Sequence, residues 1–328
     1  MLNKSTNVYA THSGIPLECD IYTADKTPDD APVVLFFHAG GLVCFGRDAI
    51  PPWLVQVCYK RGWPLMSPSY RLLPQTGSKG LLEDAAAAYE YAQNYNVSGG
   101  SNRRVIVGGA SGGFFMASAI ANTIKPAPLA LFSISGICTF HHAFFNSSTL
   151  LTPEPIPDSD VAAVVSGPAI IGRCSPDDRK VFALDKLLPD GARNADYKPD
   201  ATLKPFTKEE EQYWDQRGVL YDYYTHRNEW TKLVGDLDPA FGTAAFTAEK
   251  KAAWPLTVVF HGNEDYDVPL GVSELMRDAV GGDTVSLFVA DGQPHLYEMT
   301  RFIEDEDACM DAVRKAVARL DDIVAKGK

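Results

Sequence analysis

The sequence has no uninterrupted apolar run of about 18 residues, no cysteine pair with C-x-x-C spacing and no excess of basic residues. Without a long apolar run, no segment is expected to span a membrane. The 30 lysines and arginines are outnumbered by 42 aspartates and glutamates, which gives a net charge of -12. That charge argues against nucleic acid or an anionic membrane surface as a partner. We expect a small-molecule substrate.

The six cysteines are scattered along the chain, and most of them lie in apolar stretches (Cys19, Cys44, Cys58, Cys138, Cys174, Cys309). This favours buried thiols in a reducing compartment over disulfides. The segment Met1–Thr6 has no apolar core typical of a secretion signal, so we expect a cytoplasmic location. No group of His, Cys and Asp residues has metal-ligand spacing, and therefore no metal or cofactor is expected. A homodimer is compatible with the sequence.

Apolar segments alternate with helix-like segments along much of the chain. Val33–Phe37 is a continuous apolar run, which is typical of a strand covered on both faces. Asn7–His12 and Leu17–Tyr22, joined at Ser13-Gly14, predict an N-terminal hairpin. Helices are expected at 50–62, 80–94, 113–124, 272–279 and 304–325, and further strands at 64–67, 105–107, 129–138, 256–261 and 284–290. This order predicts a doubly wound, mostly parallel α/β sheet. Glu83 and Asp84 are expected in the first turn of the 80–94 helix, where they suit its dipole.

The alternation stops after the sixth predicted strand. Residues 139–253 contain many prolines and aromatic residues and only short helical pieces, such as Lys208–Arg217. This stretch is too apolar for a disordered linker and too irregular for an α/β repeat. It therefore predicts a cap inserted into one discontinuous domain, whose core consists of residues 1–138 and 254–328.

One serine has the surroundings that a catalytic nucleophile requires. Gly109-Ala110-Ser111-Gly112-Gly113 is a G-x-S-x-G match between an apolar strand and the start of a helix. A sharp strand-to-helix turn leaves no room for a Cβ atom beside the serine and lifts its hydroxyl clear of the sheet. By itself the pattern also fits a glycine-rich turn with a surface serine. A catalytic serine requires that the chain also supplies a base, an acid and an oxyanion site, whereas a surface serine does not.

A serine hydroxyl needs a base to remove its proton, and the chain has seven histidines. His295 follows the last predicted strand, in a loop at the sheet edge that should also carry Ser111. His261 ends a strand and precedes a glycine turn, which makes it a weaker candidate. His141 and His142 open the cap and are expected to pack or to face water, with lining of the pocket as the alternative. Nothing around His12 or His226 supports a catalytic role. His295 is therefore the predicted base.

An acid that orients the base is expected in the loop after the preceding strand. Glu264, Asp265 and Asp267 all lie there, and the residues alone do not rank them. The oxyanion site is expected in His38-Ala39-Gly40-Gly41, because small residues let backbone N–H groups approach a developing negative charge. Together with the Gly112 N–H behind the serine, Gly40 and Gly41 are the predicted donors. Side chains expected to contact substrate are His38, Phe114, His141, His142 and Tyr223.

In this order, the pieces resemble the α/β-hydrolase superfamily, and in particular its hormone-sensitive-lipase and carboxylesterase branch. The His-Gly-Gly-Gly loop of that branch is matched by His38–Gly41, and its Tyr-Arg-Leu-x-Pro segment by Tyr70–Pro74. Its helix with an early acidic residue is matched by Glu83–Ala87, and its Gly-x-x-Asp-x-x-Val-Pro pattern by Gly262–Pro269. The resemblance implies the α/β-hydrolase fold, an acid at Asp265 and a base at His295. Two features depart from the branch: Ala39 replaces a glycine, and the insertion follows the sixth strand instead of preceding the first strands.

These residues predict a serine hydrolase that cleaves a carboxylic ester through an acyl-enzyme. The expected substrate is an apolar or aromatic small molecule, although the aromatic rings of the insertion fit equally well as its own core. Hydrolysis of a lactone, an arylformamide or a carbon–carbon bond uses the same triad and stays an alternative. A non-catalytic small-molecule receptor on the same fold is the alternative from another class, because fold alone does not imply function. A structural or interaction module ranks last.

Overall fold

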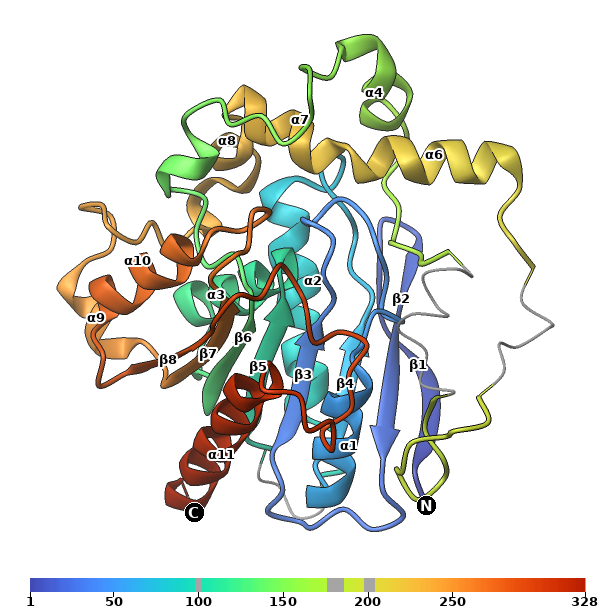
Figure 1. Cartoon of the computed structure of the whole chain (residues 1–328), viewed down its shortest axis with the longest axis vertical. Coiled ribbons are helices and arrows are strands. Elements are labelled where there is room, and N and C mark those ends of the chain that lie inside the picture. Colours follow the sequence, from blue (N-terminus) through green and yellow to red (C-terminus); the bar gives the residue numbers. More distant parts are fainter. Residues whose placement is uncertain (98–101, 176–185, 198–203, 328) are drawn as a thin grey trace.

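A central sheet organises the computed structural model, which describes residues 1–97, 102–175, 186–197 and 204–327. Its eight strands lie in the order β1-β2-β4-β3-β5-β6-β7-β8 (Figure 1). The two N-terminal strands form an antiparallel hairpin, β2 pairs antiparallel with β4, and all other neighbours are parallel. The strands are β1 (Asn3–His12), β2 (Ile15–Thr23), β3 (Val33–Phe37), β4 (Leu65–Pro68), β5 (Val105–Ala110), β6 (Ala130–Ile134), β7 (Thr257–Gly262) and β8 (Val285–Ala290). The predicted mostly parallel sheet and its hairpin are confirmed.

Helices cover both faces of the sheet, as the continuous apolar strands require. The helices that pack on the sheet are α1 (Pro52–Arg61), α2 (Gly77–Gln93), α3 (Gly112–Thr123), α10 (Leu270–Val280) and α11 (Met310–Lys326). Helices α1 and α11 form one core with one face, and α2, α3 and α10 form the other core with the opposite face. Local residues fix both ends of helix α1. A proline lies in its first turn, and Gly62 follows its last residue in the left-handed conformation (φ 64°).

The chain between β6 and β7 contributes helices and, within its described residues, no strand of the sheet. Its elements are η1 (Ala143–Phe145), α4 (Asp158–Val165), α6 (Lys208–Gly218), α7 (Leu220–Arg227), α8 (Trp230–Val234), η3 (Gly235–Leu237) and α9 (Ala248–Ala253). Figure 1 shows α4, α6, α7 and α8 lying across one end of the sheet. The start of α6 is fixed by a capping box between Thr207 and Glu210.

Aromatic side chains of this inserted segment pack with one another and join the core that α2, α3 and α10 form with the sheet. Phe140, Phe145 and Trp230 are fully buried, and the rings of Phe140 and Trp230 stack with centroids 4.8 Å apart. Of the two interpretations of the aromatic content, burial in a core explains these three rings, and Phe140 also contacts Phe115 of α3 (centroids 5.1 Å apart). That the segment acts as a cap stays a prediction.

Several boundaries differ from the sequence prediction, among them those of β6 and α11. Strand β6 ends at Ile134 instead of residue 138, because Ser135 adopts a positive φ of 44° and leaves the sheet. Helix α11 begins at Met310 instead of residue 304, after a stretch of turns.

The cysteines lie where the sequence predicts them, mostly in buried positions. All six cysteines are thiols, five of them buried and Cys44 partly exposed. Within the described ranges, none of the helices combines the length and the apolar character needed to cross a bilayer.

Candidate active site

Ser111 stands between β5 and α3, at the end of the central strand of the sheet. Its backbone has φ 51° and ψ -126°, a conformation that residues with a Cβ atom adopt only under constraint. The constraint comes from its backbone bonds: its N–H donates to the Ile134 carbonyl (2.9 Å), and its carbonyl accepts from the Ile137 N–H (2.9 Å). The side chain is 6% exposed. The turn therefore presents a nearly buried hydroxyl in one fixed direction.

The glycines on either side of Ser111 are required by close packing. A Cβ atom at Gly109 would lie 2.3 Å from the Gly113 carbonyl carbon, and one at Gly113 would lie 2.2 Å from the Phe37 carbonyl oxygen. Contacts that short do not occur with a real Cβ atom, so any larger residue would displace the backbone of the turn. The steric argument made from the sequence is confirmed.

A chain of hydrogen bonds connects Ser111 to two residues far away in the sequence. The Nε2 atom of His295 lies 3.0 Å from the Ser111 Oγ, and its Nδ1 atom lies 2.6 Å from the Asp265 Oδ2. Because a carboxylate only accepts, Nδ1 carries the proton and Nε2 accepts from the serine hydroxyl. His295 follows β8 and Asp265 follows β7, so the two loops meet Ser111 at the same edge of the sheet.

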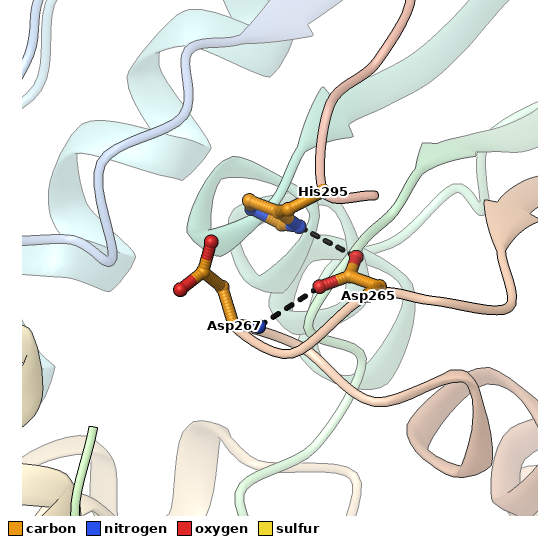
Figure 2. A group of neighbouring side chains, drawn as sticks. All are labelled: Asp265, Asp267 and His295. Atoms are coloured by element: carbon orange, nitrogen blue, oxygen red, sulfur yellow. Dashed lines mark hydrogen bonds and ion pairs between the residues drawn. The ribbon is translucent and has the colours of Figure 1, made fainter. Parts of the chain in front are cut away.

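Asp265 is held by several donors at once (Figure 2). Its Oδ2 accepts from His295, and its Oδ1 accepts from the backbone N–H groups of Asp267 (3.0 Å) and Val268 (2.8 Å). Burial alone would raise the pKa of Asp265, but hydrogen bonds from His261 and His295 lower it to about 2. The carboxyl group is therefore ionised at neutral pH. Of its two competitors in the loop, Glu264 and Asp267 are both exposed.

A second histidine contacts the same carboxylate and was not predicted in this position. His261, fully buried at the end of β7, places its Nε2 atom 3.0 Å from the Asp265 Oδ2 and 2.7 Å from the Val268 carbonyl. Both neighbours are acceptors, so Nε2 carries the proton, and Nδ1 accepts from the buried Ser273 hydroxyl at 2.9 Å. The sequence signal was a histidine at the end of a buried strand, directly before a glycine.

The loop after β3 lies against the start of α3. A Cβ atom at Gly112 would lie 2.7 Å from the Gly41 Cα, which shows how closely the two backbones approach. Gly40 and Gly41 both have positive φ values, 108° and 57°. Their N–H groups, and that of Gly112 in the first turn of α3, form no hydrogen bond with any residue that the structure describes. They are available as donors to a ligand, as an oxyanion site requires.

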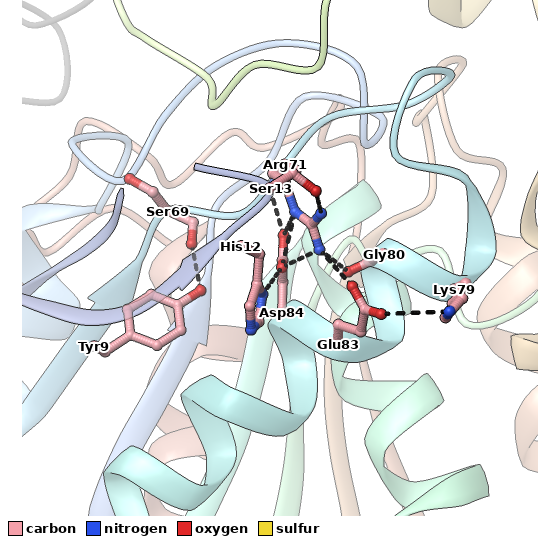
Figure 3. Close-up of polar contacts among 9 residues, drawn as sticks. All are labelled: Tyr9, His12, Ser13, Ser69, Arg71, Lys79, Gly80, Glu83 and Asp84. Atoms are coloured by element: carbon pink, nitrogen blue, oxygen red, sulfur yellow. Dashed lines mark hydrogen bonds and ion pairs between the residues drawn. The ribbon is translucent and has the colours of Figure 1, made fainter. Parts of the chain in front are cut away.

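This loop is supported from behind by the Tyr70–Pro74 segment. The Leu73 N–H donates to the Leu42 carbonyl (2.9 Å), and the Tyr70 hydroxyl donates to the His38 carbonyl (3.0 Å). Arg71, in the same segment, forms a buried ion pair with Asp84 at 2.7 Å (Figure 3).

The prediction that Glu83 and Asp84 serve the helix dipole is wrong. Helix α2 starts at Gly77, which puts both residues beyond its first turn. Asp84 instead accepts from the backbone and the guanidinium of Arg71 and lies 2.7 Å from the His12 Nδ1 (Figure 3). Glu83 also binds Arg71, at 3.0 Å. Pairing with Arg71, which follows β4, and the contact of Asp84 with His12 at the end of β1 determined the positions of these carboxylates.

The residues predicted to contact substrate lie in different surroundings, and that they contact substrate stays a prediction. His38 and Phe114 are fully buried in the core. His38 stacks on Tyr70 with centroids 4.3 Å apart, and burial lowers its pKa to about 4. The Tyr223 hydroxyl donates to Asp158 within the inserted segment (3.1 Å). His141 is exposed, and His142 caps η1 by accepting from the Phe144 N–H.

Two further residues of the inserted segment contact the loops around Ser111. Arg217 is fully buried and donates to the carbonyls of Val43 (2.8 Å) and Leu73 (2.5 Å). Tyr221 lies against Gly41, and its hydroxyl donates to the Asp267 carbonyl (2.7 Å). Nothing in the sequence around either residue signalled these contacts, because both depend on how the segment folds back over the sheet.

One group of side chains also has the spacing of metal ligands. Within the described part of the chain, Asp265, Asp267 and His295 bring one ligand atom each within 4.8 Å of one another. Both ring nitrogens of His295 are already engaged, Nδ1 with Asp265 and Nε2 with Ser111. The donor set therefore suits a hydrogen-bonded chain better than a metal site.

Comparison with known proteins agrees with this architecture. Residues 34–154 match a family described as alpha/beta hydrolase fold. An alpha/beta hydrolase superfamily protein from Enterococcus faecalis superimposes with a TM-score of 0.64 at 15% identity, over 99% of both chains. The predicted α/β-hydrolase fold is confirmed.

Two curated relatives differ in the part of this chain that they match. Lipase 2 of Moraxella sp. (strain TA144) is 31% identical over 105 residues, which cover 31% of this chain and 24% of the lipase. The non-reducing polyketide synthase ausA of Penicillium brasilianum is 24% identical over 336 residues, which cover 94% of this chain and 13% of the synthase. This chain thus spans a quarter or less of the length of these two relatives.

Proposed function

The chain has the α/β-hydrolase fold and resembles the hormone-sensitive-lipase and carboxylesterase branch, and from this premise we propose that it is a serine hydrolase of carboxylic esters. The observation that supports this most directly is the hydrogen-bonded chain from the Ser111 hydroxyl through His295 to Asp265. The resemblance to a lipase over 105 residues supports the same reaction.

In the proposed reaction, the Ser111 Oγ attacks the ester carbonyl carbon while the His295 Nε2 accepts the hydroxyl proton. The carbonyl oxygen becomes an oxyanion and accepts hydrogen bonds from the N–H groups of Gly40, Gly41 and Gly112. When the carbon–oxygen bond to the alcohol breaks, His295 returns the proton to the leaving alcohol. Water then repeats the sequence on the acyl-enzyme, releasing the acid and restoring the serine. Asp265 stays ionised and stabilises the histidine in its cationic form.

Replacing Ser111 tests this proposal. Ser111→Ala should lower kcat for a short 4-nitrophenyl ester by about a thousandfold or more, because no other group can form the acyl-enzyme. Mass spectrometry after fluorophosphonate treatment should place the label on Ser111 in the wild type. Ser147→Ala, which changes an exposed serine of the inserted segment, is the matched control.

Two results would overturn the proposal. One is wild-type turnover in folded Ser111→Ala. The other is an intact wild-type protein that neither hydrolyses esters nor reacts with the fluorophosphonate, which would favour a non-catalytic receptor on the same fold.

A second candidate substrate is a polyketide-type acyl thioester. The match to a polyketide synthase over 94% of this chain favours it, and a thioester carbonyl is open to the same attack by Ser111. Comparing kcat/KM for N-acetylcysteamine thioesters of aromatic acids with that for the matching oxygen esters distinguishes the two. Lactones and arylformamides belong in the same panel, since they need the same three side chains. The role of residues 139–253 as a cap over this site is part of the proposal.

A further inference from the structure

Tyr221 is the point where the inserted segment meets both sides of the proposed catalytic centre. A Cβ atom built on Gly41 would lie 2.6 Å from the Tyr221 Cδ2, so the ring occupies the space directly beside the oxyanion loop. Its hydroxyl donates to the Asp267 carbonyl at 2.7 Å, in the loop that carries Asp265. A single side chain thus spans from the proposed oxyanion donors to the acid loop.

The neighbouring side chains hold this ring in place. The Tyr221 ring contacts Trp230 (centroids 5.6 Å apart) and Phe145 (6.5 Å), both of which are fully buried. Four residues earlier, at the end of α6, the buried Arg217 guanidinium donates to the carbonyls of Val43 and Leu73, beside the same loop. Tyr221 itself is only partly buried. A ring that is held by buried neighbours beside the oxyanion loop and is itself partly exposed has the properties of a wall of a binding site.

We propose that Tyr221 is a specificity-determining residue, whose ring limits the size of the ester substituent that can lie beside the oxyanion loop. This inference rests on the proposed function, because it assigns the ring a role at the Ser111 site. Trp230 and Phe145 hold the ring beside Gly41, and the hydroxyl adds a hydrogen bond to the Asp267 carbonyl. A smaller side chain leaves space there, and a longer acyl chain or a larger alcohol fills it.

Two substitutions separate the ring from its hydroxyl. Tyr221→Leu removes the ring, and Tyr221→Phe removes only the hydrogen bond. The readout is kcat/KM for 4-nitrophenyl esters from acetate to decanoate, and for acetates of alcohols of increasing size. In Tyr221→Leu the ratio for octanoate over acetate, or for a large over a small alcohol, should rise by about tenfold. In Tyr221→Phe the ratios should stay within about threefold of the wild type.

The matched control is Tyr213→Leu, which removes a partly buried ring of α6 that packs on Trp214. It should leave both ratios unchanged. Circular dichroism and the melting temperature establish that each variant is folded; if Tyr221→Leu does not fold, Tyr221→Met takes its place. A folded ring-deletion variant with unchanged ratios in both series overturns the inference, while turnover that still depends on Ser111 leaves the proposed function intact. Turnover that does not depend on Ser111 overturns both.

Discussion

At the scale of single residues, Asp265 accepts hydrogen bonds from several groups besides His295, its one donor within the proposed triad. Its Oδ2 is shared by two histidines, His295, which also bonds Ser111, and His261 at the end of β7. The His261 ring is fixed in turn by Ser273 and by the Val268 carbonyl. Hydrogen bonds to a charged group are stronger and more directional than neutral ones, so His261 restricts the carboxylate to the orientation that His295 needs.

We therefore predict that His261→Leu slows the reaction without weakening substrate binding. Loss of one hydrogen bond to the carboxylate should lower kcat by about tenfold to a hundredfold while KM stays within about threefold. Steady-state kinetics on a short 4-nitrophenyl ester measure both constants. His226→Leu, which changes a histidine bonded to the Ser148 carbonyl, is the control and should have no effect. An unchanged kcat in folded His261→Leu would contradict the role given to this ring.

At the scale of elements, a buried ion pair joins the N-terminal hairpin, the Tyr70–Pro74 segment and α2. The side chains of Arg71 and Asp84 are 5% and 0% exposed, and His12 reaches Asp84 from the end of β1. Removing one member of a buried pair leaves the other charge without compensation, which costs more than the pair itself contributes. Because Leu73 in this segment holds the Leu42 carbonyl, the loss should extend to the oxyanion loop.

The expected effect of Asp84→Ala is a fall in the free energy of unfolding of about 3 kcal/mol. Urea unfolding followed by circular dichroism measures it. Lys79→Ala is the comparison, because Lys79 is 89% exposed and lies 4.0 Å from Glu83, and an exposed pair of this kind contributes little. Equal unfolding free energies for Asp84→Ala and the wild type would show that the pair does not stabilise the fold.

At the scale of the whole molecule, the sheet brings strands from both halves of the chain together. The described residues packed around its edge leave one buried acid without a hydrogen-bond partner. Glu298 is fully buried three residues after His295, and neither of its carboxyl oxygens has a hydrogen-bond partner among the described residues. Burial raises the pKa of Glu298 from 4.5 to about 8, and the nearby Asp265 charge adds to the effect. The folded protein therefore holds this proton at neutral pH, whereas the unfolded chain releases it.

This difference predicts how stability depends on pH. Above the unfolded pKa the unfolded chain binds fewer protons than the folded protein, so Glu298 lowers stability by about 1.4 kcal/mol for each pH unit up to its folded pKa. Between pH 5 and pH 8, the free energy of unfolding of Glu298→Gln should thus rise progressively relative to that of the wild type. Urea unfolding at pH 5, 6.5 and 8 tests this, with the exposed Glu306→Gln as control. Parallel curves for the wild type and Glu298→Gln would contradict it.

The sequence by itself determined the sheet, the nucleophile turn, the candidate residues Ser111 and His295, and a loop with three candidate acids. These features are local patterns: continuous apolar strands, glycines where a Cβ atom has no room, and polar residues directly after strand ends. In a parallel sheet such local positions already imply proximity, because the carboxyl ends of the strands share one edge. The choice of Asp265 over its neighbours came from the family resemblance, and the buried hydrogen bonds of that carboxylate agree with it.

Only the tertiary structure decided which side chains surround this centre. Arg217 and Tyr221 reach the oxyanion loop from more than 170 residues further along the chain, and His261 shares the acid with His295. The same folding placed His38 and Phe114 in the core and paired Asp84 with Arg71. These positions depend on how irregular segments pack on one another, and hydrophobic periodicity carries no information about such contacts.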